Sequence, residues 1–244
     1  MKSDKTMAID PKKQARCIFE YIYFARMDSV IDDVNVYHAR IVAGKALAES
    51  YPVDADLVVG VPDSGLVAAK GYSEQSGIPY GMAFHKNSYV GRTLSSQTES
   101  AGKQCEDQAE RDRRGCKGKT YCMVDDSIVR GTTCANIIKM LKKAGAKEVH
   151  VRISSPPFLH PCYFGTDVPS NEQLIAHSHT TEQIREMIGA DSLGYMEVDK
   201  LKTWSVIWHI VTHASPVIIR WKYLEEMFRW HLNRKQVKIV GWKN

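Results

Sequence analysis

The segment KTYCMVDDSIVRGTTCANIIKMLKKAGAKEVHVRISS, residues 119–155, decides the fold class. Its first residues predict a buried strand, because Thr, Tyr and Val lead an apolar run up to the acidic pair Asp125 and Asp126. A loop that contains Gly131 follows, then a helical pattern that Gly145 ends, and then a second strand, EVHVRISS. A strand, a helix and a strand in this order predict a right-handed crossover within a parallel sheet.

The same order occurs earlier in the chain. Residues 36–50 are rich in Ala and predict a helix, residues 55–62 read ADLVVGVP and predict a buried strand, and residues 66–76 predict another helix. We therefore expect an α/β domain with a parallel sheet. Because ligands bind beyond the carboxyl ends of such strands, the loops 62–65 and 125–133 should share one site.

Composition excludes several classes of protein. The chain has 244 residues, with 43% hydrophobic and 25% charged residues, which is typical of a globular protein. Its net charge of +5 comes from the tail, since residues 201–244 hold 8 Lys or Arg against 2 acids, whereas residues 1–200 hold 25 against 26. All five tryptophans also lie after residue 203. A nucleic-acid-binding face is therefore not expected.

Targeting signals are also missing from the sequence. The N-terminus has no apolar stretch, and six cysteines do not form a dense disulfide pattern, so we expect a reducing, cytoplasmic setting. The longest apolar stretch, residues 204–219, is interrupted by His, Ser, Thr and Pro and falls short of the ~18 clean residues of a membrane span. A membrane helix is therefore a weak alternative, and no membrane partner is predicted.

The residues around the acidic pair indicate a chemistry. Asp125 and Asp126 at a strand end can accept hydrogen bonds from two vicinal hydroxyls or approach a hard divalent cation such as Mg²⁺. The loop after them offers consecutive backbone N–H groups, the hydroxyls of Ser127, Thr132 and Thr133, and a helix N-terminus, which together favour a phosphate. The alternative is an acidic strand end and a capped helix with no ligand.

An acidic pair for a ribose followed by a phosphate loop resembles the phosphoribosyl pyrophosphate motif of type I phosphoribosyltransferases. A wider resemblance, to the phosphoribosyltransferase half of the glutamine phosphoribosylpyrophosphate amidotransferases of purine synthesis, covers residues 12–201. It rests on CIFEYIYFAR at 17–26, VGVPDSG at 59–65, HKNSYVGRT at 85–93, VDDSIVRGTT at 124–133 and AGAKEVHVRISSPP at 144–157. The resemblance implies the parallel-sheet type I phosphoribosyltransferase fold, here with a divergent Trp-rich C-terminal tail.

The resemblance also implies roles for individual residues. Asp125 and Asp126 would hold the ribose hydroxyls and Mg²⁺, with Ser64 beside the metal. Lys86 and Arg92 would act in catalysis by facing the pyrophosphate; taken alone, they could equally be solvated surface charges. The 5′-phosphate would be bound by Ser127, Ile128, Val129, Arg130, Gly131, Thr132 and Thr133.

In an iron–sulfur subgroup of this family, four cysteines bind a [4Fe–4S] cluster. Cys17 and Cys162 match the first two of them, but no cysteine follows Cys162, so the closing CxxC is missing and the ligand set is half complete. Cys122 on a strand and Cys134 on a helix are expected to be small buried side chains.

Three departures from the family shape the expected domain organisation. Residues 1–16 are a linker in the place of the family's glutaminase domain, so glutamine hydrolysis is not expected and ammonia would be free or delivered by a partner chain. Residues 17–200 form the phosphoribosyltransferase domain, within which residues 94–116 do not resemble the loop that closes over the substrate. Residues 201–244 are a divergent basic tail. Shifted reading frames or sequence errors would explain both divergent stretches.

The function implied is transfer of an amino group to C1 of 5-phosphoribosyl 1-pyrophosphate, giving 5-phosphoribosylamine and pyrophosphate, the first step of de novo purine synthesis. The alternative is an impaired module that binds phosphoribosyl pyrophosphate or purine nucleotides without turnover. Salvage of a nucleobase shares the phosphate loop but not the wider matches. In the family, purine nucleotides are possible inhibitors and the enzyme is a homotetramer, an assembly that a missing glutaminase domain argues against here.

Overall fold

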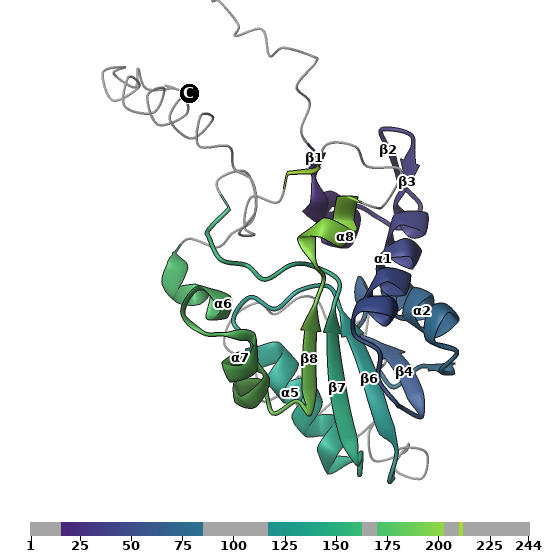
Figure 1. Ribbon diagram of the computed structural model, residues 1–244, viewed down its shortest axis with the longest axis vertical. Coiled ribbons are helices and arrows are strands. Elements are labelled where there is room, and N and C mark those ends of the chain that lie inside the picture. Colours follow the sequence, from purple (N-terminus) through teal and green to yellow (C-terminus); the bar gives the residue numbers. More distant parts are fainter. Residues whose placement is uncertain (1–15, 85–116, 163–169, 203–209, 212–244) are drawn as a thin grey trace, which may run out of the picture.

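The protein is built on a parallel sheet of five strands, as the sequence predicts (Figure 1). The computed structural model describes residues 16–84, 117–162, 170–202 and 210–211. In spatial order the sheet is β5-β4-β6-β7-β8, and all four neighbouring pairs are parallel. The strands are β4 (Leu57–Gly60), β5 (Tyr80–Gly81), β6 (Thr120–Asp125), β7 (Glu148–Ile153) and β8 (Ser192–Tyr195).

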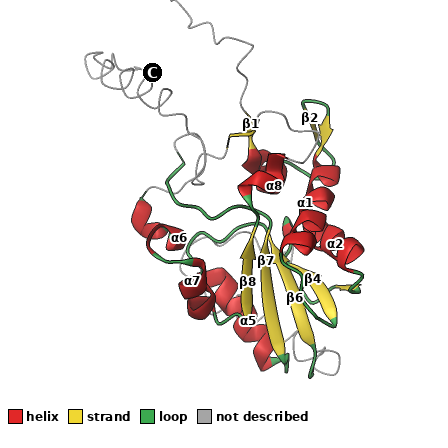
Figure 2. Ribbon diagram, in the orientation of Figure 1, coloured by secondary structure: helices red, strands yellow, loops and turns green. Residues whose placement is uncertain are grey.

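Helices cover the sheet on both faces, which gives three layers (Figure 2). The four main helices are α1 (Val36–Ser50), α2 (Gly65–Ser76), α5 (Thr132–Lys143) and α7 (Thr181–Ile188). Val58 and Val124 point to the face that α1 and α2 cover. Val59, Met123 and Val151 point to the opposite face and pack with α5 and α7. The central strand β6 is buried along its whole length, because each face has its own hydrophobic core.

The remaining elements are short. β1 (Arg16–Cys17) pairs in parallel with β9 (Ile210–Val211), and β2 (Val30–Ile31) pairs antiparallel with β3 (Val34–Asn35). The others are a π-helical turn η2 (Glu20–Phe24), a 3-10 turn η3 (Asn171–Gln173), α6 (Ile175–Ser178) and α8 (Val198–Lys202). The β1–β9 pair joins the start of the described chain to two residues that follow position 200.

Local sequence explains where the helices begin and end. The side chain of Asn35 accepts the N–H of His38 at 3.0 Å and caps the start of α1. Gly77 ends α2 with a φ of 75°, a left-handed conformation that favours glycine. Helices α1 and α2 approach so closely that a Cβ on Gly44 would lie 1.9 Å from the carbonyl oxygen of Ala68. Glycine is therefore required where the two helices cross.

The elements predicted from long patterns are confirmed, and two edge strands are new. The helix expected at residues 36–50 is α1, and the strands expected around 55–62, 119–126 and 148–155 are β4, β6 and β7. The sequence analysis did not identify β5 and β8, because strands of two and four residues are too short to show a period.

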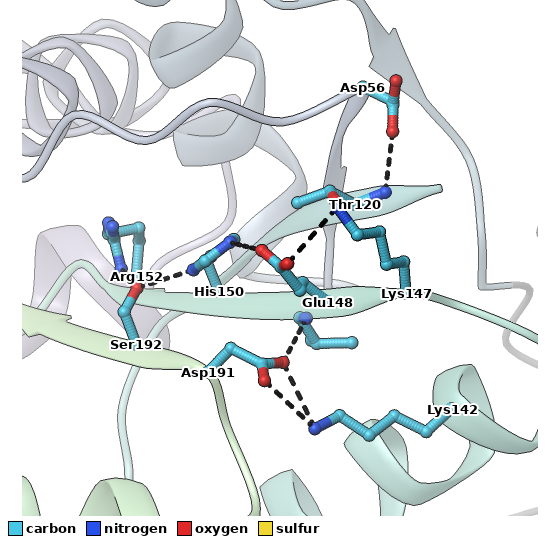
Figure 3. A network of polar contacts seen from close by, with 10 residues as sticks. Asp56, Thr120, Lys142, Lys147, Glu148, His150, Arg152, Asp191 and Ser192 are labelled. Atoms are coloured by element: carbon cyan, nitrogen blue, oxygen red, sulfur yellow. Dashed lines mark hydrogen bonds and ion pairs between the residues drawn. The ribbon is translucent and has the colours of Figure 1, made fainter. Parts of the chain in front are cut away.

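A network of polar contacts joins the strands at the amino ends of β6, β7 and β8 (Figure 3). Asp56 accepts the N–H of Thr120 at 2.7 Å. Asp191 accepts the N–H of Val149 at 2.7 Å and lies 3.2 Å from the Lys142 ammonium. These contacts pair the polar groups at the amino end of the sheet with one another.

His150 occupies the middle of this network. Its Nδ1 lies 2.9 Å from the Ser192 hydroxyl, which also accepts a hydrogen bond from Arg152, and its Nε2 lies 3.3 Å from the Glu148 carboxylate. Burial lowers the pKa of His150, helped by the charge of Arg152 and opposed by Glu148 and Asp191.

No helix within the described ranges is long and apolar enough to cross a membrane. Most of the stretch 204–219, which the sequence analysis weighed for such a span, lies outside those ranges.

Candidate functional site

The two loops that were expected to share a site meet at the carboxyl ends of β4 and β6. The N–H of Val61 donates to the carbonyl of Val124 at 2.9 Å, which continues the pairing of the two strands into the loops. The Ser64 hydroxyl then donates to Oδ2 of Asp126. The turn at residues 62–65 therefore lies directly against the acidic pair.

The acidic pair is buried and held in place by the backbone. Asp125 and Asp126 are each 8% exposed. The N–H of Asp126 donates to Oδ1 of Asp125 at 2.8 Å, and the N–H groups of Ser154 and Ser155 donate to the two aspartate carbonyls at 2.9 Å. The end of β7 thereby fixes the backbone of both acids.

The electrostatics of the pair favour a bound cation. Burial raises the pKa of Asp125 to about 7, and the neighbouring charge of Asp126 adds to the rise. Burial also raises the pKa of Asp126, although the hydroxyls of Ser127 and Ser64 oppose this by donating to its two carboxylate oxygens. Neither carboxylate forms an ion pair with another described residue.

A metal at this place would therefore have oxygen ligands only. Two carboxylates and one hydroxyl suit Mg²⁺, which prefers oxygen donors and keeps several waters. The described residues include no group of three or more His, Cys, Asp or Glu that could hold a metal ion. A cation bound by the acidic pair and Ser64 would thus take its remaining ligands from water or from a substrate.

The loop at residues 127–133, for which the sequence analysis predicts phosphate binding and which is called the phosphate loop below, follows the acidic pair without a break. Ile128 is buried in the core beneath α5 and α7, which anchors the loop. Gly131 has a φ of 81°, and a Cβ there would lie 3.0 Å from Cδ1 of Ile175, so glycine allows the turn into α5. The first N–H groups of α5 have no acceptor within the helix. Together with the helix dipole, they provide a place for an anion.

Sequence reasoning missed Arg40, a buried cation behind the site. Arg40 is 6% exposed and donates to the carbonyls of Tyr21 at 2.7 Å and Ala25 at 2.8 Å, which closes the end of η2. Its charge opposes the rise in the pKa of Asp126. The signal was present in the sequence, since Arg40 shares the apolar face of α1 with Val36 and Ala43, and a charge at such a position must find partners.

The other predicted site residues have different outcomes. Lys86, Arg92 and the whole stretch 94–116 lie outside the described residues. Cys17 and Cys162 are both half-buried. Burial raises the pKa of Cys17, and the charge of Cys162 adds to that rise. Cys122 and Cys134 are buried, as expected.

The match to a family model defines the class of protein. Residues 35–154 match the phosphoribosyl transferase domain. This range contains β4, β6, the turn at 62–65 and the complete phosphate loop. With the parallel sheet described above, the chain carries a phosphoribosyltransferase domain of the type I fold.

Full-length relatives narrow the class to one family. The chain is 51% identical over 191 residues to an amidophosphoribosyltransferase of Archaeoglobus fulgidus, covering 78% of this chain and 42% of the relative. It is 52% identical over 186 residues to that of Bacillus subtilis, covering 76% and 39%. The chain thus spans about two fifths of the length of these relatives.

A solved structure agrees with the sequence matches. Glutamine phosphoribosylpyrophosphate amidotransferase from B. subtilis, complexed with ADP and GMP, superposes with a TM-score of 0.69 at 49% identity, covering 78% of this chain and 42% of that one. The domain is similar, in sequence and in structure, to the phosphoribosyltransferase portion of the amidophosphoribosyltransferases.

Proposed function

We propose that the site binds 5-phosphoribosyl 1-pyrophosphate together with Mg²⁺. The carboxylates of Asp125 and Asp126 would accept hydrogen bonds from the two ribose hydroxyls, and the loop at residues 127–133 would bind the 5′-phosphate. The observation that supports this most directly is the hydrogen bond from Ser64 to Asp126, because it joins the turn after β4 to the acidic pair where the phosphate loop begins.

The ligand balances the charge of the site. Burial of two adjacent carboxylates is costly, because the charge of Arg40 opposes the rise in pKa at Asp126 only, and that cost would fall when a divalent cation and hydroxyl donors arrive. Bound between Ser64, Asp125 and Asp126, Mg²⁺ would neutralise charge that builds up on the leaving pyrophosphate. Lys86 and Arg92 would face the same pyrophosphate and would also stabilise its negative charge.

The reaction that fits this arrangement is amino transfer at C1 of the ribose. The lone pair of ammonia forms the C1–N bond on the face opposite the leaving group, so the configuration inverts. The C1–O bond breaks, its electron pair leaves with pyrophosphate, and the new ammonium loses one proton to solvent. The products are 5-phosphoribosylamine and pyrophosphate, the first step of de novo purine synthesis.

Several properties of the whole protein belong to the same proposal. Residues 17–200 act as the transferase unit, and ammonia is either free or derived from glutamine by a glutaminase unit. We propose a cytoplasmic location and inhibition by purine nucleotides; the B. subtilis relative is known in complex with ADP and GMP. Cys17 and Cys162 would supply two thiol ligands, which is half of a [4Fe–4S] set.

The experiment supplies purified protein with Mg²⁺ and phosphoribosyl pyrophosphate, adds ammonia, glutamine or a nucleobase in turn, and measures pyrophosphate release. Release that depends on ammonia supports amino transfer. Release with adenine or hypoxanthine would exclude it in favour of nucleobase salvage. Saturable binding without release under any condition would leave a binding module instead.

A matched pair of variants tests the residues. Asp126→Asn should weaken phosphoribosyl pyrophosphate binding at least about tenfold, because a hydrogen bond to a charged group is worth about 1.5–3 kcal/mol. Asp54→Asn removes an exposed carboxylate away from the site and should bind as the wild type does. Equal affinities of the two variants for phosphoribosyl pyrophosphate would show that the acidic pair does not take part in binding.

A further inference from the structure

The phosphate loop is tied to a second segment, residues 170–178, that no sequence motif marked. The Arg130 guanidinium donates to Oε1 of Gln173. One residue earlier in the loop, the carbonyl of Val129 accepts the N–H of Ile175 at 2.9 Å. Two adjacent loop residues are therefore hydrogen-bonded to η3 and to the first residue of α6.

Apolar packing supports the same connection. Leu174 is 1% exposed and forms a small separate core with Phe158, against which Val129 packs. On the other side of the loop, Ile175 lies against Gly131. The segment that carries Gln173 is thus fixed by its own buried neighbours and can act as a stable support for a loop that has no regular structure.

The direction of Arg130 is the unexpected feature. It is the one cation among the loop residues 127–133, so an anionic ligand would be its obvious partner. Its guanidinium is nevertheless engaged with an uncharged side chain from another segment. An arginine held in this way can orient the backbone N–H groups of its own loop toward a ligand while its side chain stays outside.

We propose that Gln173 is a positioning residue, which holds the phosphate loop in its anion-binding conformation through Arg130. The proposal rests on the function proposed above for the loop, and it assigns Arg130 to the support of the loop rather than to contact with the 5′-phosphate. Gln173 itself would touch no part of the substrate.

A double-mutant cycle tests the proposal in the full chain. Phosphoribosyl pyrophosphate affinity is measured by calorimetry for Arg130→Met, Gln173→Met and the double variant. Each single change should weaken binding by about three- to tenfold, the effect of losing one hydrogen bond. The double variant should be no weaker than the weaker single variant, because both changes remove the same interaction.

Two further variants separate positioning from general loss of structure. Gln173→Glu keeps the acceptor oxygen and should retain wild-type affinity. Glu172→Ala changes the exposed neighbour on the same turn and should have no effect. A loss for Arg130→Met with wild-type affinity for Gln173→Met would overturn the proposal, since Arg130 would then contact the ligand directly. Additive losses in the double variant would overturn it as well.

A measurement without ligand keeps this proposal distinct from the proposed function. In the ligand-free protein, Gln173→Met should accelerate hydrogen exchange of the Ile175 amide, which donates to the loop, by at least about threefold, whereas Glu172→Ala should not. If the wild type fails to bind phosphoribosyl pyrophosphate, the proposed function is wrong. The hydrogen-exchange result alone then decides whether Gln173 holds the loop in place through Arg130. An unchanged rate of hydrogen exchange at Ile175 in Gln173→Met would refute the positioning role of Gln173, whether or not the protein binds phosphoribosyl pyrophosphate.

Discussion

Replacing Gly65 with alanine should damage the site more than the fold. Gly65 is the first residue of α2 and packs against the end of β6. A Cβ at this position would lie 2.6 Å from the carbonyl oxygen of Val124 and 3.1 Å from Cα of Asp125. Both contacts are with backbone atoms, so no side chain can rotate away, and the helix and the strand must separate by several tenths of an ångström.

The expected cost can be estimated from this geometry. Overpacking of a close contact lowers the free energy of unfolding by about 1–3 kcal/mol. The separation falls between Ser64 on one side and Asp126 on the other, so it also weakens the hydrogen bond that joins the turn to the acidic pair. Because hydrogen bonds to charged groups are worth about 1.5–3 kcal/mol, the affinity for phosphoribosyl pyrophosphate should fall roughly tenfold or more.

Gly77→Ala is the matched control at the other end of the same helix. Nothing lies within 4 Å of a Cβ at Gly77, but its φ of 75° makes alanine unfavourable by about 1–2 kcal/mol. Urea denaturation and calorimetric titration with phosphoribosyl pyrophosphate should show similar stability losses for the two variants and weaker binding only for Gly65→Ala. Wild-type affinity for Gly65→Ala, or an equal loss for Gly77→Ala, would refute the reasoning.

Other predictions follow from contacts elsewhere. Gly44→Ala should lower the free energy of unfolding by about 3 kcal/mol in urea denaturation, because α1 and α2 must move apart where they cross; a loss below about 1 kcal/mol would contradict this packing. Arg40→Met should lower the free energy of unfolding by about 2–4 kcal/mol in the same assay, because it leaves buried carbonyls at the end of η2 without a donor. Arg40→Lys should have an intermediate stability, and an unchanged stability of Arg40→Met would contradict the role of Arg40 as the donor to these carbonyls. Since burial lowers the pKa of His150, the folded state resists its protonation, so part of the stability present above the ordinary histidine pKa of about 6.5 is lost as pH falls toward the lower folded-state pKa. Urea midpoints measured at pH 7.5, 6 and 5 should fall less steeply with decreasing pH for His150→Asn than for the wild type, and the exposed His38→Asn is the control. The same dependence of the midpoint on pH in all three proteins would contradict a contribution from His150. Analysis of iron and sulfide should show no complete cluster on the purified chain, because only two matching thiols are present; four irons per chain would contradict this.

The sequence predicted those parts of the fold that have a long pattern or a strong local rule. The strand and helix around Asp125 and Asp126 were found because an apolar run, a glycine and an amphipathic helix follow one another there. Their meeting with Ser64 was also predictable, because adjacent parallel strands place their carboxyl-terminal loops at the same edge.

The missed features depend on contacts between segments far apart in the chain. The position of Arg40 on the apolar face of α1 indicates that its charge needs partners, but the carbonyls of η2 that it binds are known only from the fold. Gln173 lies 43 residues from Arg130, in a turn of three residues with no pattern of its own. Neighbours of this kind become visible only when the chain is folded, so the loop could be predicted from the sequence and its support could not.

The two ends of the sheet use the same residue type in opposite ways. At the amino end, burial of Asp191 is outweighed by the Val149 amide and the Lys142 ammonium, which together lower its pKa. At the carboxyl end, burial raises the pKa of Asp125, and the charge of the neighbouring carboxylate of Asp126 adds to the rise. The first arrangement stabilises the folded chain by itself. The second is unfavourable until a cation or a set of hydroxyl donors arrives, so the electrostatic cost at Asp125 and Asp126 is what a ligand would relieve on binding.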